Sequence, residues 1–328
     1  MKSRLRTSSD LRRVLEQFPR RGEVAILAHM RPDGDAIGSM LGLAAAVEEA
    51  GLRAVRLCPD PVPEVYRFLP GADLVRSRLP ARLPKVAVAL DCDATHRLAK
   101  FEQALPRFKT LIDIDHHSGQ QPFGTAAWID PGASSVGEMV YVVLKRLQIP
   151  IGPEAATCLY TAIVTDTGRF CYQNTTAKSL RVAAELVEAG ADPAHVAVHV
   201  YEAKPLGAVR LVGRALRNLK VENAGRFVSS RLTLSDFGAA GASPEDTEGI
   251  IDHLRAIKGA EVAVLLSEQR DGKVRVSLRS RGRLNVAAVA GMFGGGGHLY
   301  AAGCILDGPL STAYRRLMRA VRAAAASA

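Results

Sequence analysis

The sequence is poor in cysteine, in aromatic residues and in long apolar runs. Its five cysteines lie far apart and form no C-x-x-C pair. This spacing excludes a cysteine-rich zinc framework and a disulfide scaffold, and it fits reduced thiols in the cytoplasm. Phenylalanine, tryptophan and tyrosine make up 5% of the residues, and no stripe mixes them with basic residues. We therefore expect no long track for single-stranded nucleic acid, which would need stacking platforms.

Apolar stretches long enough to cross a bilayer are also lacking. The apolar runs are short or are interrupted by charged residues and glycine, whereas a membrane-spanning helix needs about 20 consecutive apolar residues. The first residues are basic but lack the apolar core of a signal peptide. We therefore expect no membrane association and a cytoplasmic location.

What the chain does have is length, apolar content and positive charge. Its 328 residues are 48% apolar, which is enough for about two domains with buried cores. The net charge of +10 is uneven, because residues 191–328 carry 19 Lys and Arg against 12 Asp and Glu. A basic C-terminal part suggests an anionic ligand such as phosphate, and a solvated basic surface is the alternative interpretation.

The first 190 residues alternate short apolar segments with helical ones. This order is typical of β-α-β units and predicts a doubly wound parallel sheet. The expected strands are 23–29, 53–58 (an outer strand), 85–91 and 110–115, and the expected helices are 35–51, 134–149, 153–166 and 176–190.

From about residue 191 the pattern changes. Residues 191–220 read as a helical bridge broken at Pro205, and later segments alternate like strands, with a hairpin across Asp271-Gly272. The fold class we expect is α/β in two lobes, the second being smaller and mixed. The expected domains are 1–190 (catalytic), 191–225 (helical linker) and 226–328 (substrate-binding). In the last of these we expect strands at 226–234, 261–269 and 273–280, and helices at 243–259 and from Ser311.

Acidic residues and histidines stand where the expected strands and one helix end. In an open parallel sheet these ends form the binding edge, so the side chains should converge there. They are His29, Asp33, Asp35, Asp91, Asp115, His116, His117 and Asp166. So many carboxylates in one place repel one another unless cations bind, and the number suits two divalent ions bridged by one carboxylate. Oxygen and imidazole donors without thiolates favour Mn²⁺, with Mg²⁺, Co²⁺ or Fe²⁺ as alternatives.

Each of these residues alone has an ordinary structural explanation. A single aspartate at a strand end commonly caps a helix or forms a turn, and a single histidine commonly forms a hydrogen bond in the core. Four matches at the ends of strands or helices together favour a metal site over these separate explanations.

Four motifs, in their order along the chain, resemble those of the DHH phosphoesterase superfamily. They are HMRPDGDAIGS, the strand that ends at Asp91, DHH and TDTGRF. The later SLRSRG and NVAAVAGMFGGGGHLYAAG resemble its DHHA1 substrate lobe, so the resemblance covers nearly the whole chain. The compact size and the GGGGH…AAG ending are most similar to the nanoRNase branch, which consists of exonucleases for short oligoribonucleotides that also dephosphorylate pAp.

The resemblance implies a role for each residue of the cluster. One ion takes His29, Asp33 and Asp91, and the second takes Asp35, His116 and Asp166, with Asp91 bridging the two. It also implies that His117 faces the substrate phosphate and that Asp115 holds an imidazole from behind. The implied chemistry is hydrolysis by water that two cations activate, without a side-chain nucleophile.

A second group of residues is implied to bind the substrate. A glycine run can bring backbone N–H groups close to an anion, and a flexible hinge is the other interpretation. For Arg97 and Arg169, a surface salt bridge is as good an explanation as phosphate contact. Leu299 departs from the family, because relatives often have a basic residue at that place. The candidates are Arg279, Ser280, Gly295, Gly296, Gly297, His298, Arg97 and Arg169.

The expected function is that of a metal-dependent hydrolase. It would release mononucleotides from RNA of a few nucleotides and convert pAp to AMP, so its partners would be short single-stranded RNA and such nucleotides. The first alternative is a phosphodiesterase of cyclic dinucleotides or of linear pApA. A non-catalytic nucleotide sensor and an inorganic pyrophosphatase are less favoured. The sequence leaves the oligomeric state open, with a homodimer as one option.

Overall fold

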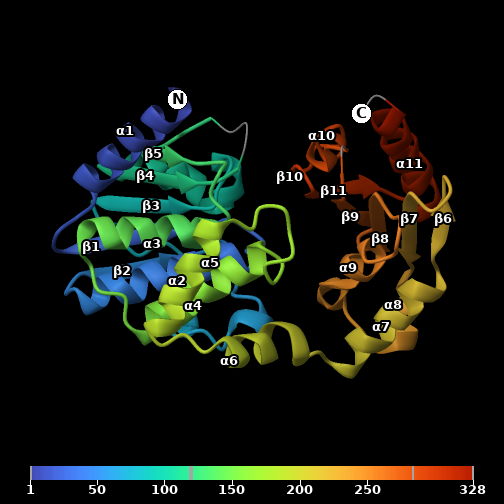
Figure 1. Ribbon diagram of the computed structural model, residues 1–328, viewed down its shortest axis with the longest axis horizontal. Helices are drawn as coiled ribbons and strands as arrows, with labels where there is room; N and C mark the ends of the chain where they lie inside the picture. Colours follow the sequence, from blue (N-terminus) through green and yellow to red (C-terminus); the bar gives the residue numbers. More distant parts are fainter. Residues whose placement is uncertain (1, 118–120, 283, 327–328) are drawn as a thin grey trace. The chain divides into compact units, whose positions relative to one another are not determined.

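The computed structural model describes residues 2–117, 121–282 and 284–326 (Figure 1). The chain forms two compact units that divide between Ala203 and Lys204. Each unit has its own sheet and its own hydrophobic core. Among the described helices, none combines the length and the apolar character needed to cross a bilayer.

The first unit is built on a five-stranded parallel sheet with the order β2-β1-β3-β4-β5. The strands are β1 (Glu23–Leu27), β2 (Arg53–Leu57), β3 (Val86–Leu90), β4 (Thr110–Asp115) and β5 (Ala126–Ile129). The central strands are almost wholly apolar because both faces of the sheet are covered. β2 is an outer strand, as expected, and β5 at the other edge is an addition that the sequence pattern did not predict.

Helices cover the two faces of this sheet (Figure 1). The elements are α1 (Lys2–Gln17), α2 (Gly34–Glu49), η1 (Glu64–Tyr66), η2 (Ala72–Leu74), η3 (Thr95–Arg107), α3 (Val136–Leu147), α4 (Pro153–Asp166), α5 (Ala177–Glu188), α6 (Pro193–Ala197) and the π-helical η4 (Val198–Glu202). Helices α2, α3 and α4 pack on the face that presents Ile26 and Ile112, and η3 packs on the opposite face. The predicted doubly wound α/β arrangement is thus confirmed, and α1 is a further helix that was not predicted.

Two glycines allow α2, α3 and α4 to approach one another closely. A Cβ on Gly38 of α2 would lie 2.5 Å from the carbonyl oxygen of Cys158, and one on Gly137 of α3 would lie 2.5 Å from the Cβ of Ala162. Such distances are far below van der Waals contact, so these positions exclude a larger side chain. The close packing matters for function because α2, α3 and α4 all end or begin at the carboxyl edge of the sheet.

The second unit contains a six-stranded mixed sheet with the order β10-β11-β9-β8-β7-β6. Its strands are β6 (Lys220–Glu222), β7 (Phe227–Leu232), β8 (Val262–Glu268), β9 (Lys273–Ser280), β10 (Gly296–His298) and β11 (Ala301–Asp307). One face is covered by α7 (Leu206–Arg217), α8 (Leu234–Ala240) and α9 (Ile250–Arg255), and the other by α10 (Val286–Gly291) and α11 (Leu310–Ala326). The β8–β9 hairpin turns at Gly272, as predicted, and the mixed α/β character of this lobe is confirmed.

One expected helix is divided in the structure, whereas the break expected at Pro205 is observed. The segment 243–259 is divided into η5 (Pro244–Thr247) and α9, because Gly249 adopts the left-handed conformation with φ +81° and interrupts the helix. The segment 191–220 is divided at Pro205: α6 and η4 belong to the first unit and α7 belongs to the second. A proline in this place favours the break because it has no N–H for a continuing helix.

Candidate metal centre

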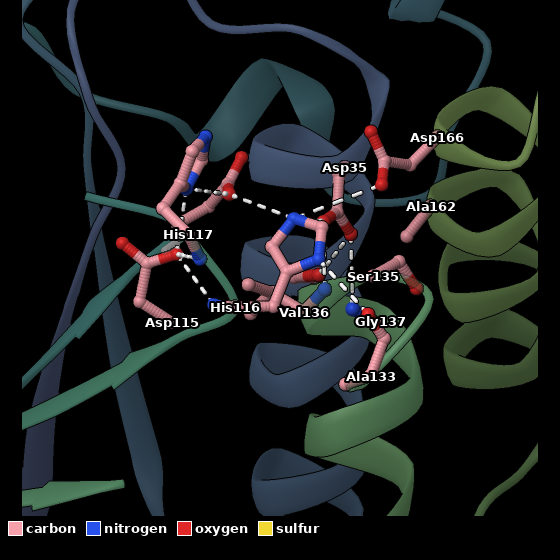
Figure 2. A network of polar contacts seen from close by, with 12 residues as sticks. Asp35, Asp115, His116, His117, Ala133, Ser135, Val136, Gly137, Ala162 and Asp166 are labelled. Carbon is pink, nitrogen blue, oxygen red and sulfur yellow. Dashed lines mark hydrogen bonds and ion pairs between the residues drawn. The ribbon is translucent and has the colours of Figure 1, made fainter. Parts of the chain in front are cut away.

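Acidic and histidine side chains converge beyond the carboxyl ends of β1, β3 and β4 (Figure 2). Their ligand atoms form three groups, and within each group all atoms lie within 4.8 Å of one another. The groups are His29, Asp33 and Asp91; Asp35, His116 and Asp166; and Asp91, Asp115, His116 and His117. The structure thus brings together all eight residues that the strand-end argument selected. Asp91 belongs to two of the groups and connects them.

The first group comes from the ends of β1 and β3 and from the start of α2. Asp33 caps α2, because its Oδ1 accepts a hydrogen bond from Ala36 N at 3.0 Å. Asp91 follows β3 in a left-handed conformation with φ +58°, which aspartate tolerates better than most residues. His29 Nδ1 lies 2.8 Å from Met30 O and Nε2 lies 3.5 Å from Asp91 Oδ2. Arg97 Nη2, which can only donate, also lies 2.7 Å from Nδ1, and Nε2 is the ring nitrogen that faces Asp91.

The second group surrounds the ring of His116. Nε2 of His116 lies 3.7 Å from Asp35 Oδ2, 3.8 Å from Asp91 Oδ1 and 3.6 Å from Asp166 Oδ2. His116 Nδ1 lies 3.2 Å from Ala133 O, which fixes the ring from the other side. Both His116 and Asp35 are buried. A ring nitrogen that faces three carboxylates at these distances leaves room for a shared cation.

Asp115 explains why two histidines stand side by side. Its Oδ1 accepts hydrogen bonds from His116 N at 2.5 Å, His117 N at 3.0 Å and His117 Nδ1 at 2.7 Å. The carboxylate therefore shapes the turn after β4 and also fixes the ring of His117. The rings of His116 and His117 are at 69° to each other, so the two imidazoles are directed differently and can serve different ligands.

Burial raises the pKa of two of these carboxyl groups. For Asp35, burial and then the charges of Asp91 and Asp166 raise the pKa well above its ordinary value. For Asp166, burial raises the pKa to about 7; the charges of His116 and His117 lower it, and those of Asp33 and Asp91 raise it. Burial thus favours the protonated form of both groups, and a divalent cation would displace the proton.

Asp91 and His117 are shifted toward their charged forms. Burial alone would raise the pKa of Asp91, but the hydrogen bond with His29 and the charge of His117 outweigh it and lower the pKa. Burial alone would lower the pKa of His117, but its hydrogen bond to Asp115 and the charge of Asp91 raise the pKa to about 10. The centre therefore combines a permanent anion with a histidine that Asp115 keeps protonated.

The donor set fits divalent cations. Asp91 Oδ1 is buried without a hydrogen bond and lies 3.5 Å from His117 Nδ1 and 3.8 Å from His116 Nε2, beyond good hydrogen-bond length. A buried carboxylate oxygen in this position is suited to bind a cation. Carboxylate and imidazole ligands without thiolates suit Mn²⁺, Mg²⁺ or Co²⁺.

Removing the metal is expected to destabilise the protein more at pH 8 than at pH 6. Between the unfolded-state pKa of about 3.9 and the raised pKa of Asp166, about 7 in the folded chain, the folded state binds more protons. The free energy of unfolding of the metal-free protein therefore falls as pH rises through this window. Mn²⁺ at one fixed concentration, 100 times its Kd at pH 8, should raise the midpoint of thermal unfolding by about 5 °C at pH 8 and by less at pH 6. Differential scanning calorimetry with EDTA or Mn²⁺ measures both effects, and an Asp166→Asn variant should lose part of the pH dependence. An equal or absent increase at the two pH values would contradict the expectation.

The two arginines predicted to meet phosphate lie in different surroundings. Arg97 Nη2 is 2.7 Å from His29 Nδ1, and Arg97 Nη1 is 3.4 Å from Asp93 Oδ1. Arg97 is therefore beside the metal-ligand cluster. Arg169 lies on the segment that follows α4, with φ +61° and its guanidinium 4.9 Å from the centroid of the Tyr201 ring. Arg169 is exposed, so its side chain can still reach a ligand.

In the second unit, Arg279 and Ser280 end strand β9. Arg279 Nη1 donates to Leu278 O at 3.1 Å, and Nε lies 4.0 Å from Asp252 Oδ1 on α9. Ser280 is buried and its hydroxyl donates to Leu284 O at 2.8 Å. The hydroxyl of Ser280 is therefore committed to the turn after β9, whereas Arg279 remains partly exposed.

The glycine run enters strand β10 and packs closely on β11. Gly296 is paired in the sheet, and a Cβ on Gly295 would lie 2.5 Å from the Cβ of Cys304. Gly297 has φ +132°, which a residue with a side chain rarely adopts. The side chain of His298 lies outside the described part of the chain. Close packing thus explains Gly295 and Gly297 without a ligand, and it is compatible with the predicted anion contact.

The groups that hold the clustered side chains in place were not predicted from the sequence. Asn174 donates from Nδ2 to Asp166 Oδ2 at 3.2 Å, and the carbonyl of Ala133 contacts His116. A backbone carbonyl has no sequence signal. Asn174 stands in the segment between α4 and α5, where an asparagine reads as an ordinary loop residue. Its place eight residues after a predicted ligand is the one signal that could have drawn attention to it.

A cluster of carboxylates and histidines that could hold a metal, at the carboxyl edge of a doubly wound sheet, is the arrangement expected of a metal-dependent enzyme of the α/β class. Residues 23–163 match the family model of the DHH family, N-terminal domain, and residues 225–327 match that of the DHHA1 domain. A Thermus thermophilus protein named bifunctional oligoribonuclease and PAP phosphatase NrnA is 36% identical over 92% of this chain and 90% of its own length. A Bacillus subtilis protein of the same name is 31% identical over 84% of this chain and 86% of its own.

The chain belongs to the DHH phosphoesterase family, whose members are metal-dependent hydrolases of phosphoester bonds. The resemblance inferred from the motifs is thereby confirmed. The crystal structure of an exopolyphosphatase-related protein from Bacteroides fragilis superimposes with a TM-score of 0.88 at 27% identity, covering 96% of each chain. A more distant relative, the Listeria monocytogenes cyclic-di-AMP phosphodiesterase PdeA, is 23% identical over 98% of this chain and 50% of its own length.

Proposed function

We propose that this protein releases mononucleotides from RNA of a few nucleotides and converts pAp to AMP, using two divalent ions. The observation that carries the proposal is the pair of three-ligand groups at the edge of the first unit's sheet. The two activities are those named for relatives that align with most of the chain. The two ligand groups, together with the activities named for these relatives, point to short RNA and nucleoside bisphosphates such as pAp as the substrates.

We assign His29, Asp33 and Asp91 to one ion, and Asp35, His116 and Asp166 to the second. The support is that each set has its ligand atoms within 4.8 Å of one another. When bound, the ions would supply an activated water and would offset negative charge on the phosphoryl oxygens. Manganese as the working ion is part of this proposal, supported by the oxygen and imidazole donors.

His117 would contribute a positive charge next to the substrate phosphate. In the metal-free chain its hydrogen bond to Asp115 and the charge of Asp91 raise the pKa of the ring to about 10, which favours the protonated imidazole. A preorganised cation in a buried site stabilises the charge that develops on a phosphoryl group. Asp115 would act through His117, by fixing its orientation and its proton.

Substrate contacts of the second unit are part of the same proposal. We assign the terminal phosphate or nucleoside to Arg279, His298 and the backbone of Gly295, Gly296 and Gly297. Ser280 would support this loop through its bond to Leu284 O. We further assign phosphate contact to Arg97, which lies beside His29, and to the exposed Arg169. A cytoplasmic location is also proposed, supported by five free cysteines.

The alternative of a cyclic-dinucleotide or pApA phosphodiesterase has one observation in its favour, the more distant relative PdeA. That relative is less similar, and this chain covers half of its length. We therefore rank this activity second. A non-catalytic sensor ranks lower because every ligand position of both groups is present.

A substrate panel separates these functions. The purified protein with Mn²⁺ is given 5′-labelled RNAs from dinucleotide to pentanucleotide, a 24-nucleotide RNA, pAp, pApA and cyclic di-AMP. We expect release of mononucleotide from the short RNAs and AMP from pAp at rates at least about tenfold above that on cyclic di-AMP, which corresponds to about 1.4 kcal/mol between transition states. Faster cleavage of cyclic di-AMP would establish the alternative, and absence of hydrolysis in every arm would exclude a phosphoesterase.

A further inference from the structure

The three ligands assigned to the second ion are all connected to one short segment, residues 133–137 at the start of α3. Figure 2 shows the contacts of His116 and Asp35 with this segment. His116 contacts the carbonyl of Ala133. Asp35 accepts hydrogen bonds from Val136 N at 2.7 Å and Gly137 N at 2.9 Å. This segment therefore holds two of the ligands directly through its backbone.

The third ligand, Asp166, is connected to the same segment through Asn174. The Nδ2 of Asn174 donates to Ser134 O at 2.9 Å, to Asp166 O at 3.1 Å and to Asp166 Oδ2 at 3.2 Å. All three partners are acceptors, which identifies this end of the amide as the NH₂ group. One side chain thus binds the last turn of α4 to the start of α3 and also contacts the carboxylate that faces His116.

Ser134 is a rigid anchor for this amide. Its hydroxyl donates to Glu138 Oε2 at 2.6 Å, its N–H donates to the same oxygen at 3.3 Å, and Glu138 pairs with Lys178 at 2.7 Å. Ser134 and Glu138 are buried. An anchor with so many contacts restricts the position of Asn174, and through it the position of Asp166.

Asp166 needs such a partner because of where it stands. It is the last residue of α4, where the partial negative charge of the helix end opposes a carboxylate. Its neighbours Asp35 and Asp91 are also acidic, and they raise the free energy of the ionised carboxylate further. A fixed amide donor offsets part of this repulsion and holds the oxygen toward the site.

We propose that Asn174 is a positioning residue for the second ion, which orients Asp166 against the frame formed by residues 133–137. The inference rests on the proposed function through the assignment of Asp166 as a ligand. Asn174 itself would make no contact with the substrate. Its effect should appear in the affinity for metal before it appears in the chemical step.

The test uses the full-length chain with three substitutions: Asn174→Leu, Asn174→Asp and, as a control, Gln173→Leu at the exposed neighbouring position. Leucine keeps the approximate size of asparagine and removes the donor. Aspartate keeps the shape but presents oxygen to three acceptor oxygens. Mn²⁺ binding is measured by isothermal titration calorimetry and by the electron paramagnetic resonance of free Mn²⁺. Thermal unfolding of each metal-free protein shows whether the variant is folded.

We expect the Kd of one of the two ions to rise by about 10-fold to 100-fold in both Asn174 variants, with at least as large a rise for aspartate. The other ion and the Gln173→Leu protein should be unaffected. Hydrolysis should recover when Mn²⁺ is raised in proportion to the new Kd, which a purely structural defect would not allow. Asp33→Asn alters the ligand group of the first ion and Asp166→Asn that of the second. Comparison with these two variants shows which ion is bound less tightly in the Asn174 variants.

Two results would overturn the inference. One is binding of both ions by folded Asn174→Leu within a factor of two of the unmodified protein. The other is unchanged or tighter binding in Asn174→Asp, which would mean that shape or an added ligand matters and donation does not. If the unmodified protein bound no pair of ions, the proposed function would fail first, so the two failures can be told apart.

Discussion

Asp91→Asn is expected to lower kcat/KM on short RNA by at least about 10³-fold. Asp91 belongs both to the group with His29 and Asp33 and to the group with Asp115, His116 and His117, and its carboxylate is buried against His29 and the two adjacent histidines. Asparagine keeps the shape and one oxygen but loses the charge that would hold both cations. Charge stabilisation by metal ions is worth several kcal/mol in such reactions, and each 1.36 kcal/mol corresponds to a factor of ten in rate.

The control for this variant is Asp73→Asn, which removes a carboxylate from the exposed η2. Both proteins are assayed with the same RNA and analysed for bound manganese. We expect normal activity and metal content for Asp73→Asn, and loss of both for Asp91→Asn. Full hydrolysis by Asp91→Asn would mean that this site does not perform the reaction. The chain could then be a non-catalytic nucleotide sensor, with a contaminating enzyme hydrolysing the RNA.

The positions of the eight clustered residues were accessible from sequence because of one topological rule. Parallel strands place their carboxyl ends at the same edge, so a residue such as Asp91 or Asp115 can be located once its strand is recognised. The strands themselves were recognisable because both faces are buried, which makes each a short, nearly continuous apolar run. The ligand cluster therefore follows from local patterns plus the topology.

Elements without such a pattern could not be predicted. Strand β5 has four residues and follows a loop, so it shows no periodicity, and it exists because it pairs with β4. The interruption before α9 depends on the left-handed backbone of Gly249. A glycine inside a helical pattern permits either outcome, and tertiary packing decides between them.

The groups that hold the ligands were beyond the sequence for a different reason. Asn174 and Ser134 are 40 residues apart, and their contact depends on how α3 and α4 pack. That packing in turn depends on the absence of a side chain at Gly137, where a Cβ would collide with Ala162. Ligand types can thus be predicted from residue chemistry, but the frame that orients them is a property of the packed helices.

Asp115→Asn is expected to make hydrolysis sensitive to pH in a range where the unmodified enzyme is not. The hydrogen bond to Asp115 and the charges of Asp91 and Asp115 keep the pKa of His117 at about 10, against the opposing effect of burial. Asparagine removes the contribution of Asp115, and the bound cations would offset the charge of Asp91, so the pKa of His117 should fall toward its ordinary value of about 6.5. The variant should therefore lose the protonated ring, and with it activity, as pH rises from 6 to 8. Asparagine is a mild replacement because its oxygen can still accept the bonds made to Oδ1, and its NH₂ takes the place of Oδ2, which has no hydrogen bond.

The measurement is kcat/KM on a dinucleotide at saturating Mn²⁺ between pH 5.5 and 9. His117→Ala gives the lower limit, expected at about 10²-fold to 10³-fold below the unmodified enzyme for loss of one stabilising group. At pH 8 the kcat/KM of Asp115→Asn should approach that of His117→Ala. At pH 6 it should rise part of the way to the value of the unmodified enzyme. His96→Ala, at an exposed histidine, should leave the profile unchanged. Superimposable profiles for Asp115→Asn and the unmodified enzyme would show that the charge of His117 is not used, because the substitution removes the group that maintains it while leaving the turn after β4 intact.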